Sequence, residues 1–384
     1  MNQATRTAVV ITVTATIFGL TYGLSAPLIA LELAEAGYSE SFIGANGAMY
    51  AVGVLLAAPF MPRLFGRFGF GRLAKSALLG AGSILLLFPA APFIWIWFPL
   101  RAALGAVSET LFVVSETWLN HLASEASRGR LIAIYMTALS CGTALGPTIL
   151  AFVGRHELWA FVIGGLMTFA ACTVLVFGRP QEPKAEHEDI GNPFRYLGLA
   201  PVAVASAALN AALEAAGLSL LPIYAVSLGW PEQSATLLLT VLLIGSITLQ
   251  LPIGWLGDRM PRSKLLALLA LLATIGAAFW PMALAHAWLA YPLLFVWGGV
   301  FVGIYTTTVV MLGDLYEGSE LVGIYALLSV AWGVGAFTGP FLSGIAMEMT
   351  LHGLPLFAAV ACGIFGLCAA FMPIRNRASD RIER

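Results

Sequence analysis

The sequence predicts an all-α integral membrane protein whose twelve transmembrane helices form two pseudo-symmetric six-helix bundles. Of its 384 residues, 59% are hydrophobic and only 10% are charged, and the mean hydropathy is +0.89. A water-soluble domain carries about 25% charged residues, so we expect the chain to lie in a lipid bilayer. The apolar residues form continuous runs, which exclude the alternating pattern of a membrane β-barrel. The net charge of −1 points to no nucleic-acid partner.

Each apolar run is close to or longer than the ~20 residues that a helix needs to cross the hydrocarbon layer. Short polar or charged turns separate the runs, and only helices satisfy the backbone of such segments in lipid. The twelve predicted segments cover residues 8–31, 42–62, 73–91, 93–118, 130–153, 158–177, 197–226, 235–256, 264–285, 288–313, 321–346 and 354–373.

The basic residues predict the orientation of these segments. If the N-terminus is cytoplasmic, seventeen of the nineteen Lys and Arg residues fall on the cytoplasmic side, and only Arg101 and Arg155 lie elsewhere. Cytoplasmic loops carry an excess of Lys and Arg. We therefore expect both termini in the cytoplasm.

One long polar gap divides the chain. It is charged, contains three prolines and has no apolar periodicity, which is typical of a linker. The sequence therefore predicts an N-terminal bundle at 1–178, a cytoplasmic linker at 179–195 and a C-terminal bundle at 196–384.

Landmarks of the first half recur in the second at an offset of about 193 to 195 residues. Such internal duplication is common in secondary transporters. Glycine four residues before Gly-Pro lets two helices approach closely. The matched pairs are Gly23-Leu-Ser-Ala-Pro27 with Gly217-Leu-Ser-Leu-Leu-Pro222, Phe98-Pro-Leu and Gly105 with Tyr291-Pro-Leu and Gly298, and Gly142-x-x-x-Gly146-Pro147 with Gly335-x-x-x-Gly339-Pro340.

The loop at 254–264 reads Gly-Trp-Leu-Gly-Asp-Arg-Met-Pro-Arg-Ser-Lys. It resembles the loop signature of the major facilitator superfamily, Gly-x-x-x-Asp-Arg-x-Gly-x-Arg-Arg/Lys, with Pro261 in the place of the second glycine. A degraded copy at 62–72 keeps an arginine at Arg67, a glycine at Gly69 and a final arginine at Arg72, but has Gly66 where the acid belongs.

Two further motifs extend the resemblance over essentially the whole chain. Arg101-x-x-x-Gly105 resembles another motif of the superfamily, and Glu116-Thr-Trp118 followed by Ser127-Arg-Gly-Arg130 resembles a bacterial branch that includes the YcaD-type carriers. The resemblance implies the superfamily fold, a monomer in the bacterial inner membrane, and a central cavity lined by the first, fourth, seventh and tenth segments.

The motifs of several other chemistries are missing from the sequence. There is no Gly-x-x-x-x-Gly-Lys-Ser/Thr loop to couple ATP and no His-Glu-x-x-His. The four cysteines lie inside apolar runs without zinc spacing. We therefore expect no enzyme activity, no cofactor and no metal site, and transport that runs downhill or is coupled to an ion.

Three ionisable residues lie in the segment 93–118, where such groups are costly and usually functional. At 100° per residue, Glu116 lies about 20° from Glu109, so they share one face, with Arg101 nearer the periplasmic end. An apolar medium favours the protonated form of a carboxyl group, which suits reversible proton loading. The alternative is an interhelical clamp that never titrates, and for Glu116 a gating or structural role is favoured.

The segment 197–226 carries Asn210 and Glu214 one turn apart, with Glu214 near the middle. The resemblance places Glu214 beside the central cavity. We predict that Glu214 binds the proton or the substrate, with a structural hydrogen bond as the alternative. Asn46 and Gln250 are expected to join helices to one another.

The cytoplasmic loops predict a gate. Helix N-termini attract negative charge, and in the family the loop acid contacts the start of a helix in the opposite half. We expect Asp258, with Arg259 and Arg262 beside it, to close on the helix that begins near Arg128 and Arg130.

In the first half we expect a gate contact with the charges reversed, so that the loop supplies the cation and the opposite half supplies the acid. Arg67 or Arg72 is expected to pair with Glu317 or Glu320, in a loop that also holds Asp314. The alternative for both loops is that the basic residues set topology only.

Together these features favour a secondary carrier of a small organic solute, coupled to protons and working by rocking of its two halves about a midplane cavity. A uniporter, a drug/proton antiporter and a membrane sensor that binds a solute without moving it are the alternatives. The Gly146-Pro147 motif resembles that of drug/proton antiporters but lacks the fuller glycine pattern.

Overall fold

The structure is a computed structural model that describes residues 3–123, 125–154, 158–182, 196–316 and 318–371. The described residues form helices and connecting turns without a strand. Eleven helical stretches among them are long and apolar enough to cross a membrane. The prediction of an all-α membrane protein is therefore confirmed. The chain divides into two compact units, 1–188 with 218–240 and 189–217 with 241–384.

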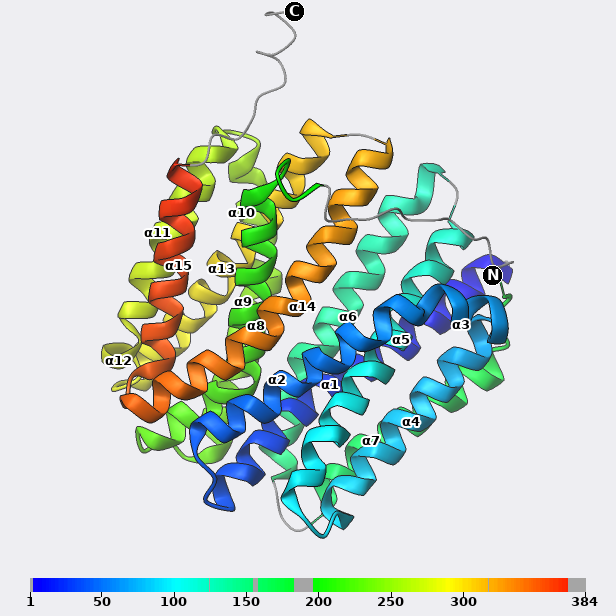
Figure 1. The fold of residues 1–384 in the computed structure, drawn as a ribbon, viewed down its shortest axis with the longest axis horizontal. Helices are drawn as coiled ribbons and strands as arrows, with labels where there is room; N and C mark the ends of the chain where they lie inside the picture. Colours follow the sequence, from blue (N-terminus) through cyan, green and yellow to red (C-terminus); the bar gives the residue numbers. More distant parts are fainter. Residues whose placement is uncertain (1–2, 124, 155–157, 183–195, 317, 372–384) are drawn as a thin grey trace, which may run out of the picture. The chain divides into compact units, whose positions relative to one another are not determined.

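The first unit contains the helices at the N-terminal side of the chain. In Figure 1, α4 and α7 run side by side; α1 packs on α6 and α7, and α5 packs on α2 and α4. The helices are α1 (Gln3–Glu35), α2 (Glu40–Ala57), the 3₁₀ turn η1 (Ala58–Phe60), α3 (Met61–Phe68), α4 (Phe70–Ala90), η2 (Ile94–Ile96), α5 (Trp97–Leu122), α6 (Glu125–Val153) and α7 (Trp159–Gly178).

The second unit contains most of the remaining helices, while α8 and α9 contribute residues to both units. Within it, α11 packs on α13 and α15, and α14 packs on α15. The helices are α8 (Pro201–Ser227), α9 (Glu232–Thr248), α10 (Gln250–Gly257), α11 (Arg262–Ala278), α12 (Trp280–Ala283), α13 (Ala287–Leu315), α14 (Gly318–Met349) and α15 (Gly353–Phe371).

Local signals in the sequence set several of the helix boundaries. After α1, Gly37 adopts a φ of 80°, a conformation that glycine takes without steric cost. Ser39 then caps α2 by accepting a hydrogen bond from the Phe42 amide at 3.5 Å. Such caps satisfy one of the free amides at a helix start.

Eleven of the twelve predicted segments match candidate spans, and the ninth, 264–285, is interrupted. It consists of the 17-residue α11 and the short α12, which meet at Phe279. Pro281 has no amide hydrogen to donate to the carbonyl of residue 277, so a continuous helix would lose that hydrogen bond. The break coincides with this proline, although α1 and α6 continue through Pro27 and Pro147.

Glycines bring α1 and α6 into close contact in the first unit. A methyl group at Gly146 would lie 2.5 Å from the Gly23 carbonyl carbon and from the Leu20 oxygen. One at Gly142 would collide with the Thr16 carbonyl. The two helix backbones touch directly, so the predicted role of the Gly142-x-x-x-Gly146 motif is confirmed.

The equivalent glycines do the same in the second unit. A methyl group at Gly335 would collide with the carbonyl oxygen of Ala208, and one at Gly339 with that of Ala212. Both alanines belong to α8 and both glycines to α14. Each half of the chain therefore uses the same small-residue contact, as the internal repeat predicts.

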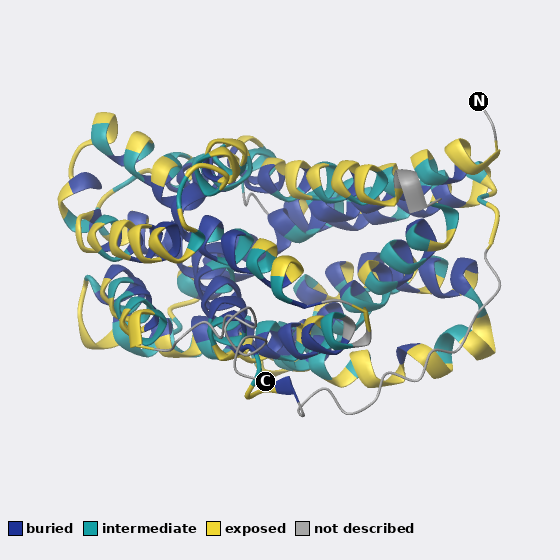
Figure 2. Cartoon of the chain, turned by 90° about the horizontal axis from the view of Figure 1, so that it is seen from above, coloured by how far each residue is buried: buried dark blue, intermediate teal, exposed yellow. Residues whose placement is uncertain are grey.

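Large apolar side chains are exposed along the helices as well as at their ends. Leu166, Leu271 and Ile364, in the middle of their helices, are each more than 50% exposed, and Phe177, near a helix end, is 78% exposed. Exposed stretches follow the helix sides in Figure 2. A water-soluble protein rarely exposes apolar surface this extensively. These faces fit a hydrocarbon environment.

Candidate functional site

The first candidate site centres on Arg101, in the second turn of α5. Its side chain is only 3% exposed. The guanidinium carbon lies 5.4 Å from the ring centre of Tyr50 on α2, and that ring lies 5.1 Å from the ring of Tyr22 on α1. A buried cation therefore rests on an aromatic pair, a contact that the ring quadrupole makes attractive.

The Arg101-x-x-x-Gly105 motif explains how this contact forms. A methyl group at Gly105 would collide with the carbonyl oxygen of Tyr50, and one at Gly53 would collide with that of Ala102. The backbones of α2 and α5 can therefore touch only because these positions are glycines. This close approach brings the Tyr50 ring within reach of Arg101 from the neighbouring helix.

Several hydrogen-bond donors near this site have no acceptor. Among the described residues, Nε and Nη1 of Arg101 have no partner, and neither does Nδ2 of Asn46. Asn46 is 1% exposed and lies one turn before Tyr50 on α2. Buried donors in proteins are nearly always paired, so each of these three nitrogens lacks an acceptor that a buried donor usually has.

Glu109 and Glu116 are half-buried further along α5. Their charges interact with one another. Tyr135 of α6, which is 1% exposed, lies within electrostatic range of Glu116. Sequence reasoning missed Tyr22, Tyr50 and Tyr135, because tyrosines in apolar segments carry no spacing signal.

The three ionisable residues of α5 do not form one cluster. Glu109 follows Arg101 by eight residues, about 12 Å along the helix axis. An arginine side chain cannot bridge that distance to a carboxylate on the same helix. Arg101 and the two acids are therefore separate elements of the first unit.

The second candidate site is on α8. Asn210 is 7% exposed, and its Oδ1 has no donor among the residues that the structure describes. Glu214, one turn later, is half-buried. Residues four apart on a helix have Cβ atoms about 5–6 Å apart. The unpartnered Oδ1 of Asn210 therefore lies on the same face of α8 as the Glu214 carboxyl group, which agrees with the predicted placement of these two residues.

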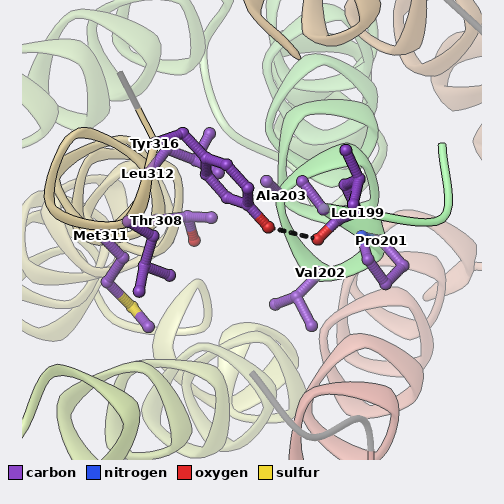
Figure 3. Close-up of a pocket in the computed structure, with 10 residues that line it drawn as sticks. Leu199, Pro201, Val202, Ala203, Thr308, Met311, Leu312 and Tyr316 are labelled. Carbon is purple, nitrogen blue, oxygen red and sulfur yellow. Dashed lines mark hydrogen bonds between the residues drawn. The ribbon is translucent and has the colours of Figure 1, made fainter. Parts of the chain in front are cut away.

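A small pocket in the second unit is lined by neither Asn210 nor Glu214. Its volume is about 50 Å³, and it lies between the start of α8 and the end of α13. Figure 3 shows the Tyr316 hydroxyl donating to the Leu199 carbonyl at 2.7 Å. A water needs roughly 10–15 Å³ on this measure, so the pocket has room for a few waters and is too small for an organic solute.

The loop residues predicted for the gate are described within their own units. Asp258 is exposed at the C-terminal end of α10, and the Arg259 guanidinium lies 3.7 Å from the centre of the Trp255 ring. Arg262 forms an ion pair with Asp314. Arg128 and Arg130 are exposed near the start of α6. The closure of Asp258 on α6 stays a prediction.

The first-half loop shows a feature that the sequence did not indicate. The carboxylate of Glu182 lies beside Gly69 and Gly71 at the start of α4. Arg67 lies 5.3 Å from the ring centre of Phe68, and Arg72 is exposed. The pairing of these arginines with Glu317 or Glu320 also stays a prediction, since Glu317 lies outside the described residues.

The segment that carries Glu182 is held by two hydrogen bonds. Trp118 Nε1 donates to the Gln181 carbonyl at 2.7 Å, and the Gln181 amide donates to Thr7 Oγ1 at 3.0 Å. The first-half loop has Gly66 where the motif has an acid. Glu182, which follows α7, nevertheless brings a carboxylate to the start of α4. Trp118 of the Glu116-Thr-Trp motif therefore anchors the end of the first unit to α5.

Comparison with known proteins agrees with this architecture. The family model of the Major Facilitator Superfamily matches residues 11–231 and, again, residues 202–383. The chain is a member of the Major Facilitator Superfamily of membrane transporters. The two matches together span residues 11–383.

Among curated relatives, a Bacillus subtilis protein described as the uncharacterized MFS-type transporter YfkF is 28% identical over 358 residues, covering 89% of this chain and 88% of its own length. The uncharacterized MFS-type transporter YcaD of Salmonella dublin is 26% identical over 338 residues, covering 87% of both chains. The predicted resemblance to YcaD-type carriers is confirmed.

Solved structures share the fold at low sequence identity. The nucleoside transporter NupG aligns with a TM-score of 0.77 and 14% identity over 97% of this chain and 99% of its own. A D-xylose-proton symporter aligns with a TM-score of 0.73 and 17% identity over 95% and 97%. These likenesses establish the fold of a membrane transporter.

Proposed function

We propose that this protein is a proton-coupled secondary carrier of a small organic solute. It resides in the bacterial inner membrane as a monomer with both termini in the cytoplasm. It works by rocking two six-helix halves, divided at residues 179–195, about a binding site near the bilayer midplane.

The observation that carries the proposal is the pair Asn210 and Glu214. When protonated, a carboxyl group donates a hydrogen bond; when ionised, it only accepts. The orphan Oδ1 of Asn210 favours a donor one turn away, so it favours protonated Glu214. Loss of the proton removes that donor, which gives the site two states with different hydrogen bonding. Ionisable groups placed in membrane helices commonly serve such proton steps.

The fold is compatible with this function. The aligned structures are described as a nucleoside transporter and a D-xylose-proton symporter, so the same arrangement of helices serves carriers of small solutes. Glu109 and Glu116 on α5 supply two further carboxyl groups in the first unit. The basic loops support the cytoplasmic location of both termini.

The test measures solute and proton movement in the same vesicles. Purified full-length protein is reconstituted in liposomes that contain a pH-sensitive dye, and candidate solutes are added one at a time. Wild type is compared with Glu214→Gln and with Glu348→Gln, an exposed carboxyl at the end of α14. Both variants remove one carboxylate charge, the first from a half-buried position and the second from an exposed position.

We expect one or more solutes to change the internal pH in wild type and in Glu348→Gln but not in Glu214→Gln. The sign of the pH change distinguishes symport from antiport. Solute uptake without any pH change would replace the proton-coupled carrier by a uniporter. Solute binding without uptake would replace it by a sensor.

A further inference from the structure

Arg101 is a buried cation whose charge the described structure leaves uncompensated. No described acidic residue forms an ion pair with it, and two of its nitrogens have no hydrogen-bond partner among the described residues. The ring of Tyr50 lies against the guanidinium and attracts it. Removing a guanidinium from water costs more than a cation–π contact returns. An anion bound beside the guanidinium would offset this cost.

The acids on the same helix cannot supply this anion. Glu109 lies about 12 Å further along α5 and Glu116 about 22 Å. Both lie on the cytoplasmic side of Arg101. The electrostatic partner that Glu109 does have is Glu116. The negative charge must come from outside α5.

Asn46 adds a second donor at the level of Arg101. On α2, Phe42 stacks edge-on against Phe98 of α5 at 5.0 Å, and Tyr50 contacts Arg101. Asn46 lies midway between these two contacts, one turn from each, on the same stripe of the helix. Its free Nδ2 therefore belongs to the same helix interface as the guanidinium.

The free groups share one chemical character. Nε and Nη1 of Arg101 and Nδ2 of Asn46 are donors only, and an ionised carboxylate is an acceptor only, with about four lone-pair sites on two oxygens. Hydrogen bonds between a guanidinium and a carboxylate are among the stronger ones in proteins. The Tyr22 and Tyr50 rings beside the cation offer an apolar surface to the rest of such a molecule.

We propose that the transported solute is an organic carboxylate, and that Arg101 and Asn46 bind its carboxylate group while its apolar body packs on Tyr22 and Tyr50. This inference rests on the proposed carrier function, because Arg101 is buried and the site must open for a solute to reach it. Alternating access supplies that opening.

The test is a binding measurement on the purified full-length protein in lipid nanodiscs at constant ionic strength. The thermal unfolding midpoint is followed against acetate, butyrate, benzoate, phenylacetate and succinate, each beside its uncharged amide, and against inorganic phosphate. Each carboxylate and its amide have nearly the same shape, so their difference reports the charge.

Wild type is compared with Arg101→Lys, Arg101→Gln and Arg63→Gln. Arg63 is an exposed cation on α3, so its variant controls for net charge. We expect at least one carboxylate to raise the midpoint saturably in wild type and in Arg63→Gln, with no effect of the matching amide. Both Arg101 variants should bind that carboxylate about tenfold or more weakly.

Four results would overturn the proposal: no shift with any carboxylate, an equal shift with the amide, a shift with phosphate alone, or unchanged affinity in the Arg101 variants. If Arg101→Gln does not fold, Arg101→Lys decides, because it keeps the charge. Binding is measured without flux. Carboxylate binding without transport would refute the carrier and leave only a carboxylate-binding site at Arg101, whereas transport of uncharged solutes without carboxylate binding would refute this inference and leave the carrier standing.

Discussion

Arg262 and Asp314 form an ion pair that joins the start of α11 to the end of α13. A helix N-terminus disfavours a cation and a C-terminus disfavours an anion, so each charge lies at the unfavourable end of its own helix. The ion pair offsets both. Within the Gly254–Lys264 motif, Arg262 therefore has a structural role inside its own unit.

The coupling between these two residues should be small but measurable. Their side chains are 25% and 60% exposed, and exposed pairs contribute about 0–1 kcal/mol because solvent screens them. We expect the double variant Arg262→Gln/Asp314→Asn to be destabilised by about 0.5 kcal/mol less than the sum of the two single variants. A double-mutant cycle on chemical unfolding in mixed micelles measures the coupling, and strictly additive single effects would contradict it.

The contact between α1 and α6 should tolerate no side chain at Gly146. The methyl group of Gly146→Ala meets the backbone of Gly23, which cannot rotate away as a flexible side chain could. We expect a loss of about 1–3 kcal/mol in the free energy of unfolding.

Gly129→Ala is the matched control for that variant. It lies on the same helix with no neighbour within 4 Å among the residues described. It should be neutral or stabilising by up to ~1 kcal/mol, because alanine favours helix more than glycine does. Equal losses in the two variants would mean that helix propensity, and not the α1–α6 contact, is measured.

The ring of Tyr50 should stabilise Arg101 independently of its hydroxyl group. Tyr50→Phe keeps a ring beneath the guanidinium, whereas Tyr50→Leu removes it, and both lose the hydroxyl. We expect the leucine variant to be less stable than the phenylalanine variant by about 0.5–2 kcal/mol, the range of a cation–π contact. Thermal unfolding of both proteins measures this difference. The same comparison in Arg101→Gln should show a smaller gap.

The carboxylate of Glu182 should stabilise the start of α4 by its charge. Negative charge at a helix N-terminus contributes about 0.3–1 kcal/mol at low salt. Glu182→Gln should therefore lower the free energy of unfolding by that amount in dilute buffer. The difference should largely vanish near 1 M salt, where the screening length is about 3 Å. A loss that persists at high salt would assign the effect to packing on Gly71.

Several features followed from the residues because their causes are local or periodic. Continuous apolar runs predicted the helices, since helices alone satisfy their backbone in lipid at this length. The repeated Gly-x-x-x-Gly-Pro motif predicted where backbones touch, because a missing side chain is visible in any sequence. The break beside Pro281 was not predicted, because a proline by itself does not mark a break: α1 and α6 continue through Pro27 and Pro147.

The candidate site was predicted only in part. Arg101, Glu109, Glu116, Asn210 and Glu214 are conspicuous because charged and amide side chains are rare in apolar segments. Their grouping was less certain, since helical periodicity relates only residues of one helix. Glu109 and Glu116 share a face of α5, but Arg101 is partnered by Tyr50 from another helix.

The sequence by itself determined the class of protein, the positions of the spans and the residues whose burial demands an explanation. Hydropathy, helical period and backbone chemistry act over a few turns of one segment. Tertiary structure alone decided that Arg101 lies on Tyr50, that Glu182 lies beside Gly71 and that Arg262 pairs with Asp314. These partners are about 50 to 110 residues apart in the chain. Many residues at such separations could have been the contact partner of each side chain. The packing of whole helices determines which one is.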